Sequence, residues 1–306
     1  MNKNKIINPI VSIIIPSFNQ GEFLDETIRS ILDQYFHQIE IIIIDAMSTD
    51  NTKEILEKYG AEIKWISEKD NGHADGVNKG FSLGTGEIFG WINADDVYCQ
   101  HSAIQKVVET FNKKPEIDIV YGDGAIIAGD GTLLRLWLVP RYNKKRIQRG
   151  NMIIQPTVFF RRNVVMNEKL KLNSLVFDYE YWLRLGEKGY RFFHINELIA
   201  ADRYHLHRVS VQRRVAIKNE ERLVRSTYSD VNQKGEQVIR FIDRFHQSLC
   251  RLKGVLVILN MLLKGDLQNR FSFNLKIDSP YKLIYRQLFH SVIFDQEVMS
   301  MIKTQK

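Results

Sequence analysis

The sequence has little cysteine and no long apolar run. Its two cysteines, Cys99 and Cys250, are too few for a disulfide framework or a cysteine metal cluster, and they fit the reducing cytoplasm. No window approaches the roughly 18 to 20 apolar residues that a membrane-spanning helix requires, and the best candidate, Gly254 to Leu263, is about half that length. The first apolar run ends at Pro16 without a small-residue cleavage site, so we interpret it as a strand and not as a signal peptide.

Glycine-rich phosphate loops and the usual nucleic-acid motifs are absent as well. Neither GxGxxG nor GxxxxGK[ST] follows a predicted strand, which argues against a dinucleotide site or a P-loop. The net charge is +7, but the basic runs at Arg141 to Arg149 and Arg213 to Arg225 carry no helix-turn-helix, zinc-finger or RNA-recognition signature. We therefore expect no nucleic-acid partner. A diphosphate substrate, anionic lipid headgroups and an ordinary solvated basic face each explain the charge.

The first hundred residues predict an α/β fold. The chain has 306 residues, of which 44% are hydrophobic and 26% are charged, so it can bury a full core. Apolar β-rich runs alternate with amphipathic stretches, which is typical of βαβ units and a mostly parallel sheet. Asp50 is a candidate N-cap for the second helix. The predicted strands are Val11 to Ile15, Ile39 to Ile44, Glu62 to Ile66 and Glu87 to Ile92, and the predicted helices are Glu22 to Asp33, Thr52 to Tyr59 and His73 to Leu83.

The pattern changes after about Pro115 to shorter strands with turn signals. We interpret Tyr121-Gly122-Asp123-Gly124 and Gly129-Asp130-Gly131 as turns. Strands at Thr157 to Phe160, Arg191 to Ile195 and Leu198 to Tyr204, with a helix at Tyr179 to Lys188, complete the same domain. Beyond Ser210 the sequence is helical and basic. We predict a catalytic domain over residues 1–210 and a helical, basic extension over residues 211–306, which would contact an acceptor, a membrane surface or a second copy of the chain.

Polar residues follow four of the predicted strands. Ligands of open α/β sheets bind outside the carboxyl ends of the strands, so these positions are the candidate site. Three of the four ends carry carboxylates, which favours a site where carboxylates and a metal hold phosphate. The four ends are Pro16 to Asn19, Asp45 to Ser48, Ser67 to Asp70 and Asn93 to Asp96.

Asp95 and Asp96 are adjacent in sequence, and two like charges side by side need a cation nearby. Oxygen ligands select Mg²⁺ or Mn²⁺, so a divalent ion is one solution. A helix N-cap before Ser102 to Phe111, or a solvated turn, is the alternative. Asp45 ends an apolar strand, where it can accept a hydrogen bond from a nucleobase or a ribose hydroxyl, or simply form a turn.

Four segments together resemble successive motifs of the family 2 glycosyltransferases, which have the GT-A fold, a Rossmann-like mixed sheet flanked by helices. The segments are VSIIIPSFNQ, IIIIDAMSTDNT, EKDNGHADGVNKG and GEIFGWINADD, and the resemblance covers residues 9 to 210. It implies an inverting enzyme that uses Mn²⁺ or Mg²⁺ and a nucleoside-diphosphate sugar as donor. It also implies that Pro16, Phe18 and Asp45 hold the nucleoside, with Phe18 against the base.

The resemblance extends to the other acidic positions. Asp70 and Asp75 match a segment that lines the nucleotide and sugar pocket. Asp96 matches the direct metal ligand, and Asp95 lies nearer the ribose or the sugar. Asn93 departs from the family pattern, because the acidic motif often begins with Asp, but the adjacent pair is intact.

Three further positions carry expectations from the family. Asp178, at the start of a predicted helix, falls where the family has its catalytic base; helix capping is the alternative role, and Glu180 is the substitute candidate. His207 resembles a family histidine that reaches the metal or the diphosphate, with His205 two residues away. Gln155-Pro156-Thr157 resembles the segment that borders the acceptor.

The sequence thus predicts transfer of a single sugar to a hydroxyl of a glycan or lipid-linked acceptor. It lacks the transmembrane spans and the Gln-x-x-Arg-Trp motif of processive polysaccharide synthases. The basic extension and the apolar stretch Val255 to Leu263 would either lie on an anionic membrane surface, at the inner face of the cell membrane, or pack into the core. A sugar nucleotidyltransferase and a non-catalytic partner subunit are the alternative functions.

Overall fold

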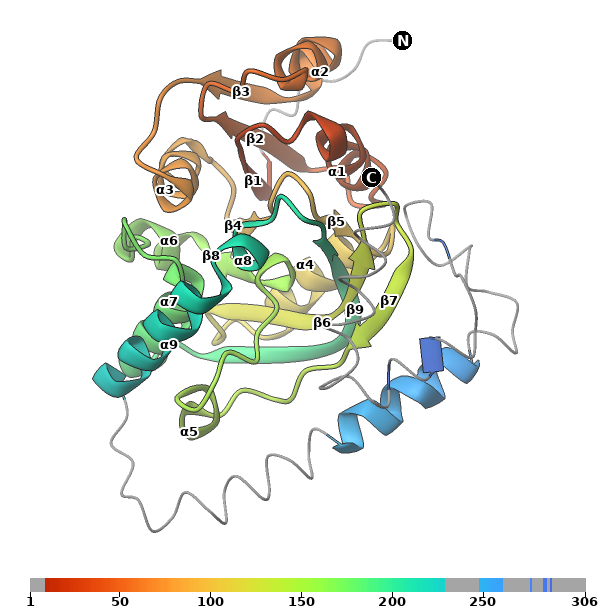
Figure 1. The fold of residues 1–306 in the computed structure, drawn as a ribbon, viewed down its shortest axis with the longest axis vertical. Helices are drawn as coiled ribbons and strands as arrows, with labels where there is room; N and C mark the ends of the chain where they lie inside the picture. The colour runs from red at the N-terminus through yellow and green to blue at the C-terminus, as the bar shows by residue number, and fades with distance from the viewer. Residues whose placement is uncertain (1–8, 229–247, 261–275, 277–282, 285–286, 288–306) are drawn as a thin grey trace.

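A computed structural model describes residues 9–228, 248–260, 276, 283–284 and 287. One curled sheet of nine strands forms its centre, with helices on both faces (Figure 1). This arrangement confirms the predicted α/β fold with a mixed sheet. The strands are β1 (Val11–Ser17), β2 (Ile39–Asp45), β3 (Lys64–Ser67), β4 (Ile88–Trp91), β5 (Val97–Tyr98), β6 (Ile119–Ala128), β7 (Leu133–Trp137), β8 (Phe159–Arg161) and β9 (Phe192–Tyr204).

Helices and turns of 3-10 helix connect these strands. The predicted helices over 52–59 and 73–83 have the expected bounds, and the other predicted elements differ by one to three residues at their ends. The helices are α1 (Gly21–Leu32), α2 (Thr52–Tyr59), α3 (His73–Leu83), α4 (Ala103–Lys113), α5 (Lys144–Ile147), α6 (Arg162–Asn167), α7 (Phe177–Glu187), α8 (Val209–Gln212) and α9 (Arg214–Tyr228), and the 3-10 turns are η1 (Gly60–Glu62) and η2 (Gln155–Thr157).

The first four strands form the parallel half of the sheet. The order is β3-β2-β1-β4, and β1 lies between β2 and β4 with all three parallel. Every residue of β1 and β2 is buried, because helices cover both faces. Ile13 of β1 packs in the cluster of α1, α2 and α4, and its neighbour Ile14 packs against α3 on the other face.

The second half of the sheet extends it in mixed orientation. Strand β8 runs antiparallel to β4 and β6, whereas β9 runs parallel to β6. Strands β1, β2, β4, β6 and β9 therefore all point their carboxyl ends the same way. The end of β9, at Tyr204, lies at the same edge as the ends of β1 and β4.

One predicted turn is wrong. Residues 121–124 lie inside β6, where the register with β9 shifts around Asp123. The glycine at 122 allows β6 to lie close to Ile199 of β9 and does not reverse the chain, since a Cβ on Gly122 would collide with Ile199. Residues 129–131 do form the predicted turn, between β6 and β7, with Gly131 at φ 85°. The two strands predicted at the end of the domain are one continuous strand, β9.

Described residues beyond 210 contact the domain before it. Helix α9 packs on α7 and places Ile217, Val224 and Tyr228 against the core. Residues 248–260 form a helix whose Ile258 is fully buried against β6 and β7. The last three residues of the predicted apolar stretch 255–263 lie outside the described residues. The boundary near residue 210 stays a prediction. Within the described residues, no helix is long and apolar enough to cross a membrane.

The packing of α3 on β1 gives a test of the fold. A Cβ at Gly80 would collide with the Ile14 side chain, and Ile14 is fully buried. We expect Gly80→Ala to lower the free energy of unfolding by about 1–3 kcal/mol, the usual cost of overpacking, although alanine favours a helix more than glycine. Gly150→Ala is the matched control, because its Cβ would meet nothing within 4 Å, and it should change stability by less than about 0.5 kcal/mol. Equal urea midpoints for the two variants would contradict the packing.

Candidate active site

Hydrogen bonds join the loop after β1 to the loop after β2. The amide of Asn19 donates to the Ser48 hydroxyl at 2.8 Å, and the Asn19 side chain accepts from the Thr49 amide at 2.8 Å. Asp50 accepts from the first amides of two helices, Gly21 of α1 and Thr52 of α2. The N-cap position of α2 is Asn51 and not Asp50 as predicted, although the Asp50 carboxylate accepts from the first amide of this helix.

The residues expected to hold a nucleoside lie at this end of β1 and β2. Asp45 is 1% exposed at the end of β2, and its carboxylate accepts from the hydroxyls of Ser48 and Ser67. Pro16 is buried in the neighbouring strand β1. Phe18, directly after β1, leaves 59% of its surface exposed. An exposed ring beside a buried, oriented carboxylate is suited to take a planar base and a hydroxyl-bearing sugar.

Asp70 and Asp75 shape the turn into α3. The Asp70 carboxylate accepts from the Gly72 amide at 2.9 Å, where Gly72 has φ 102°. Asp75 accepts from the Asn71 amide at 3.0 Å, and this bond holds its pKa below the ordinary value. Asp75 also lines a cleft of about 440 Å³ with Ile44 and Ile66. Both carboxylates lie on a segment that begins at the carboxyl end of β3.

The turn after β4 carries Asp95 and Asp96 in different environments. Asp96 is 1% exposed, and its two oxygens accept from the Arg203 amide at 2.9 Å and from the Asn93 side chain at 3.0 Å. Burial and the adjacent Asp95 carboxylate raise the pKa of Asp96 well above the ordinary value. The Asp95 side chain is 13% exposed and lies 2.8 Å from Nε2 of His205. Asp95 is therefore the more accessible of the two carboxylates.

Two arginines, one at the end of β9 and one after it, lie beside the acidic turn. Arg203 is 1% exposed, and its guanidinium donates to the carbonyls of Asp95 and Gly129 and pairs with Glu26 of α1. Arg208 pairs with Asp202 at 2.6 Å, and the surrounding carboxylates raise its pKa further above the usual range. Sequence reasoning missed both arginines. Only the parallel pairing of β9 with β6 brings them to this edge.

The two histidines at this end differ in burial. His205 is 7% exposed and packs at a tilt against Phe23, with ring centroids 4.8 Å apart, and its Nδ1 is buried without a hydrogen-bond partner in the described part of the chain. His207 is exposed, and its ring centroid lies 6.4 Å from that of His205. The structure thus places His205 in direct contact with Asp95 and His207 beside His205.

Asp178 lies in the first turn of α7, next to this edge. Val176 occupies the N-cap position, so the carboxylate of Asp178 is not the cap of its helix. The ring of the preceding residue, Phe177, stacks on Trp91 at the end of β4, with centroids 5.5 Å apart and planes 19° apart. Asn151 donates to Asp178 at 3.3 Å. Burial raises the pKa of Asp178 to about 6, which is suited to a general base near neutral pH.

Glu180, the substitute candidate, is held in a salt-bridge network. Its side chain is 3% exposed and accepts from Arg184, Lys171 and the Tyr228 hydroxyl at 3.0, 2.8 and 2.7 Å. Burial acts to raise its pKa, but these donors hold the pKa below the ordinary value. A carboxylate with all these partners is a poor proton acceptor. The geometry therefore favours Asp178 over Glu180.

The donor atoms at the Asp95 turn fit a divalent ion that is shared with a substrate. No cluster of three or more acidic, histidine or cysteine side chains that could hold a metal occurs among the described residues. Mg²⁺-type sites commonly use one or two carboxylates together with substrate phosphates, and the Asp95 oxygens are donors of this kind.

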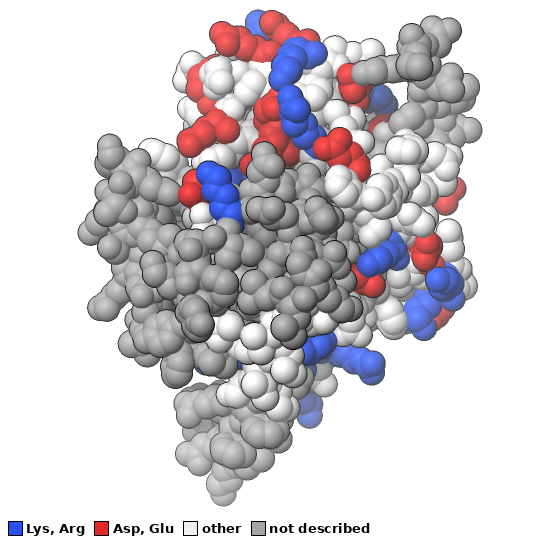
Figure 2. All heavy atoms as spheres, turned by 90° about the vertical axis from the view of Figure 1, so that its right-hand side faces the viewer, with Lys and Arg blue, Asp and Glu red and all other residues white. Residues whose placement is uncertain are grey.

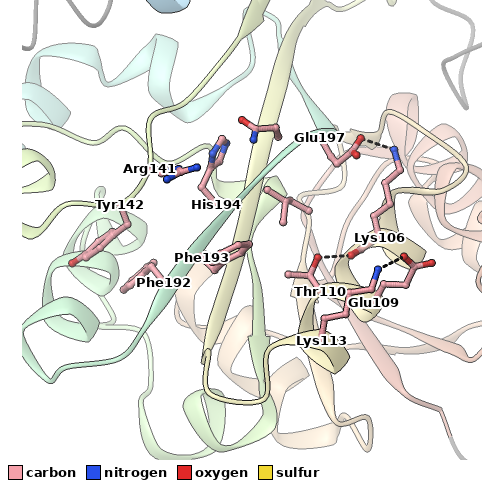
Figure 3. Close-up of a pocket in the computed structure, with 12 residues that line it drawn as sticks. Lys106, Glu109, Thr110, Lys113, Arg141, Tyr142, Phe192, Phe193, His194 and Glu197 are labelled. Atoms are coloured by element: carbon pink, nitrogen blue, oxygen red, sulfur yellow. Dashed lines mark hydrogen bonds and ion pairs between the residues drawn. The ribbon is translucent and has the colours of Figure 1, made fainter.

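A separate cleft of about 660 Å³ lies at the opposite edge of the sheet. Figure 3 shows Lys106 and Lys113 of α4 on one side and Arg141 with His194 on the other. Lys106 pairs with Glu197, and His194 contacts Asp123 at 3.0 Å. The first residues of β9 line this cleft, whereas Asp95 and Asp96 lie beside the last residues of β9. None of the predicted site residues lines it.

Comparison with known proteins identifies the class of enzyme. The profile of the family described as "Glycosyl transferase family 2" matches residues 12–169, just over half of the chain. The chain therefore belongs to glycosyltransferase family 2. It is 26% identical over 226 residues to an uncharacterized glycosyltransferase of Rickettsia prowazekii, and the match covers 70% of this chain and 66% of that protein, slightly less than two thirds.

Solved structures share the fold. TarS of Staphylococcus aureus in complex with UDP-GlcNAc superposes with a TM-score of 0.57 at 17% identity, covering 74% of this chain and 68% of that one. The mannosyltransferase PcManGT of Pyrobaculum calidifontis, in complex with GDP-Man and Mn²⁺, gives a TM-score of 0.57 at 12% identity and covers 97% of this chain and 84% of that one. At these identities the likeness shows the fold alone.

The raised pKa of Asp178 predicts a pH-dependent effect on stability. Its folded-state pKa of about 6 lies above the ordinary 3.8, so the folded chain binds this proton more tightly than the unfolded chain. The stability that this proton contributes is complete below about pH 4 and is lost as the pH rises through about 6. Asp178→Asn removes the buried charge. We expect it to raise the free energy of unfolding at pH 7.5 by about 1–3 kcal/mol and to have little effect at pH 4.

Glu180→Gln is the matched control with the opposite sign. The lowered pKa of Glu180 means that its stabilisation is present at pH 7.5 and lost in acid, so the control should destabilise at pH 7.5. Denaturant unfolding of both variants at pH 4 and pH 7.5 measures the difference. An Asp178→Asn protein that is less stable than the parent at pH 7.5 would contradict the buried charge.

Proposed function

We propose that the chain is an inverting, metal-dependent glycosyltransferase. It would transfer one sugar from a nucleoside-diphosphate sugar to a hydroxyl of a glycan or lipid-linked acceptor. The observation that carries the proposal is the placement of Asp178. Phe177 stacks on Trp91, which fixes a carboxyl group of raised pKa beside the strand that leads into the Asp95–Asp96 turn. Because the chain belongs to glycosyltransferase family 2, we assign glycosyl transfer to these two carboxylate sites.

The edge formed by β1 and β2 would bind the nucleoside. Phe18 offers an exposed ring for the base, and Asp45, held by Ser48 and Ser67, offers a fixed acceptor for a base N–H or a ribose hydroxyl. Pro16, in β1, would form one wall of this pocket. Asp70 and Asp75 would line it from the start of α3, near the sugar.

A divalent ion, Mn²⁺ or Mg²⁺, would neutralise charge on the departing diphosphate. We propose Asp95, rather than Asp96, as the carboxylate that holds it, with His205 beside Asp95 and His207 at the exposed rim. Three facts support this choice. Asp95 is the more exposed, both oxygens of Asp96 already accept hydrogen bonds, and His205 contacts Asp95 directly. Asp96 would then accept the hydrogen bond from the Arg203 amide and stabilise the turn.

Asp178 would act on the acceptor as the general base. Its carboxylate takes the proton of the acceptor hydroxyl while that oxygen forms a bond to the anomeric carbon and the bond from carbon to the diphosphate oxygen breaks. A single displacement from the face opposite the leaving group inverts the anomeric configuration. The pKa of about 6 leaves Asp178 mostly ionised at neutral pH, so it is ready to accept the proton.

The 3-10 turn at Gln155–Thr157 would border the acceptor. Gln155 donates to the Trp91 carbonyl at 2.6 Å, so this turn is fixed to the same strand end as Asp178. Peripheral attachment at the inner face of the cell membrane would present a lipid-linked acceptor there, as polysaccharide biosynthesis requires.

Asp178→Asn tests the base. Asparagine keeps the size and the hydrogen bond from Asn151 but cannot accept a proton. We expect transfer to the acceptor to fall by about a hundredfold or more, the usual scale for losing a general base, while the donor affinity stays unchanged. Single-turnover transfer and calorimetric donor binding measure the two quantities. Transfer within a few-fold of the parent at saturating substrates would remove Asp178 from this role, and an inactive parent that still binds donor would favour a non-catalytic subunit.

Asp95→Asn and Asp96→Asn form a matched pair for the metal site. We expect Asp95→Asn to weaken Mn²⁺-dependent binding of the nucleoside diphosphate by about tenfold or more. Asp96→Asn should leave this binding within a few-fold of the parent, because both Asp96 oxygens already accept hydrogen bonds within the protein. Calorimetry with and without Mn²⁺ measures the binding, and circular dichroism verifies that both variants fold. The reverse pattern would return the direct ligand to Asp96.

A further inference from the structure

Met47 combines an unfavourable backbone conformation with an exposed side chain. Its φ is 60°, in the left-handed region that glycine adopts freely but that costs free energy for a residue with a Cβ. The side chain leaves 57% of its surface exposed, so packing within the protein does little to offset this cost. Residues in such sparsely populated conformations gather at binding sites, where their surroundings impose the conformation. Met47 is therefore a candidate contact for a ligand.

The turn that orients Asp45 imposes this conformation. The Asp45 carboxylate accepts from both the amide and the hydroxyl of Ser48, so residues 45–48 form one closed turn with Met47 directly before Ser48. Ser67 donates to the same carboxylate at 2.6 Å. A carboxylate has about four acceptor positions, so these three bonds leave one for a donor group of a ligand. The same turn leaves the Met47 side chain exposed.

Hydrogen bonds on both sides of Met47 bring it next to Phe18. The Ala46 amide donates to the Ser17 carbonyl at 2.9 Å, and the Asn19 amide donates to the Ser48 hydroxyl at 2.8 Å. Phe18 and Met47 are thus the middle residues of two short segments that are joined at both ends. Because both side chains are mostly exposed, the two loops together present an aromatic ring and a thioether.

The helices that follow these two loops, α1 and α2, carry charged side chains. Asp25 of α1 pairs with Arg29 at 2.7 Å and with Lys58 of α2 at 2.9 Å. Figure 2 shows Asp, Glu, Lys and Arg side chains together at the top of its face, the level at which Figure 1 shows α1 and α2. Beside these charged helices, Phe18 and Met47 offer an apolar contact at the strand ends.

A nucleobase matches this combination of groups. Its flat face contacts an aromatic ring and a thioether favourably, and the N–H groups at its edge donate to a carboxylate. A purely apolar ligand would leave the open acceptor position of Asp45 without a donor. The proposed function already places the nucleoside of the donor at Phe18 and Asp45, so the base is the ligand group that reaches Met47.

We propose that Met47 contacts the base of the donor nucleotide, beside Phe18. The inference rests on the proposed function and adds a contact to its nucleoside site. The free protein has the unfavourable conformation at residue 47, and the thioether contact with the bound base offsets its cost. A sulfur–aromatic contact requires only the ring of the base, so Met47 increases the affinity for whichever base the site accepts.

The test compares two variants that lose the same side chain but differ in the cost of the backbone conformation. Met47→Ala keeps this cost, whereas Met47→Gly removes it, so the urea midpoint of Met47→Gly should be the higher of the two. The ligand is whichever of UDP, GDP, CDP, TDP and ADP the parent binds most tightly with Mn²⁺ by calorimetry. We expect both variants to bind it about two- to tenfold more weakly than the parent, the usual scale of a sulfur–aromatic contact.

Asn173→Gly is the matched control. Asn173 is another exposed residue with φ 60°, in the loop before α7, and the same backbone change there should leave the nucleotide affinity unchanged. A direct readout comes from the methionine methyl signals of a ¹³C-methyl-labelled parent. The signal that is missing from Met47→Ala belongs to Met47, and we expect the ring of the bound base to shift it.

The outcomes separate this inference from the proposed function. Weaker binding by both Met47 variants, together with a shifted methyl signal, supports the contact. Equal affinity of the parent and both variants, or a Met47 signal that does not move at saturating nucleotide, overturns the contact and leaves the rest of the nucleoside site in place. A loss of affinity in Met47→Gly alone also overturns it, because a more flexible turn would then be the cause. A parent that binds none of the five nucleotides overturns the proposed function and this inference with it.

Discussion

The turn after β4 that carries Asp95 and Asp96 depends on the contacts of one buried arginine. Arg203 binds the turn after β4 twice, through its amide to the Asp96 carboxylate and through its guanidinium to the Asp95 carbonyl. The same guanidinium reaches Gly129, between β6 and β7, and Glu26 of α1. The positive charge beside the two carboxylates comes from Arg208, because the Arg203 guanidinium is occupied by Glu26 and by these carbonyls. The geometry of the acidic turn is therefore set by Arg203, a residue from the other half of the sheet.

In the proposed function, the charges beside the Asp95–Asp96 turn explain how an acidic pocket binds an anionic donor. Arg208 offsets the charge of Asp202 and of Asp96 inside the fold, and Asp95 remains accessible at the surface of the turn. A diphosphate approaching Asp95 needs a cation between the two, which is the physical reason for metal dependence in the proposed function. Asp178 lies in a different environment. Burial without a cationic partner raises its pKa, whereas Glu180, two residues later, is held ionised by Arg184 and Lys171.

Much of the fold could be predicted because its elements are encoded locally. Strands β1 and β2 are continuous apolar runs, and α2 and α3 have apolar residues at helical spacing, so their bounds follow from the residues themselves. The prediction for residues 121–124 was wrong because Gly122 leaves room for Ile199 and Gly124 for Ile154, two residues that are distant in sequence. Likewise, Asn196 and Glu197 look like a break, although β9 runs through them beside β6.

The candidate site also combines residues that can be predicted locally with residues that depend on distant parts of the chain. Asp45, Asp95 and Asp178 could be predicted because each follows a strand or begins a helix. The contributions of Arg203, His205 and Arg208 could not, because they require the knowledge that β9 runs parallel to β6 and ends beside β4.

The pH dependence of transfer tests the central claim most directly. If Asp178 is the base, kcat/KM of the parent rises with pH and levels off above an apparent pKa of about 6, since only the ionised carboxylate accepts the proton. The residual activity of Asp178→Asn should lack this step. A step near pH 6 that persists unchanged in the variant, or a parent profile that is flat between pH 5 and pH 8, would contradict the account.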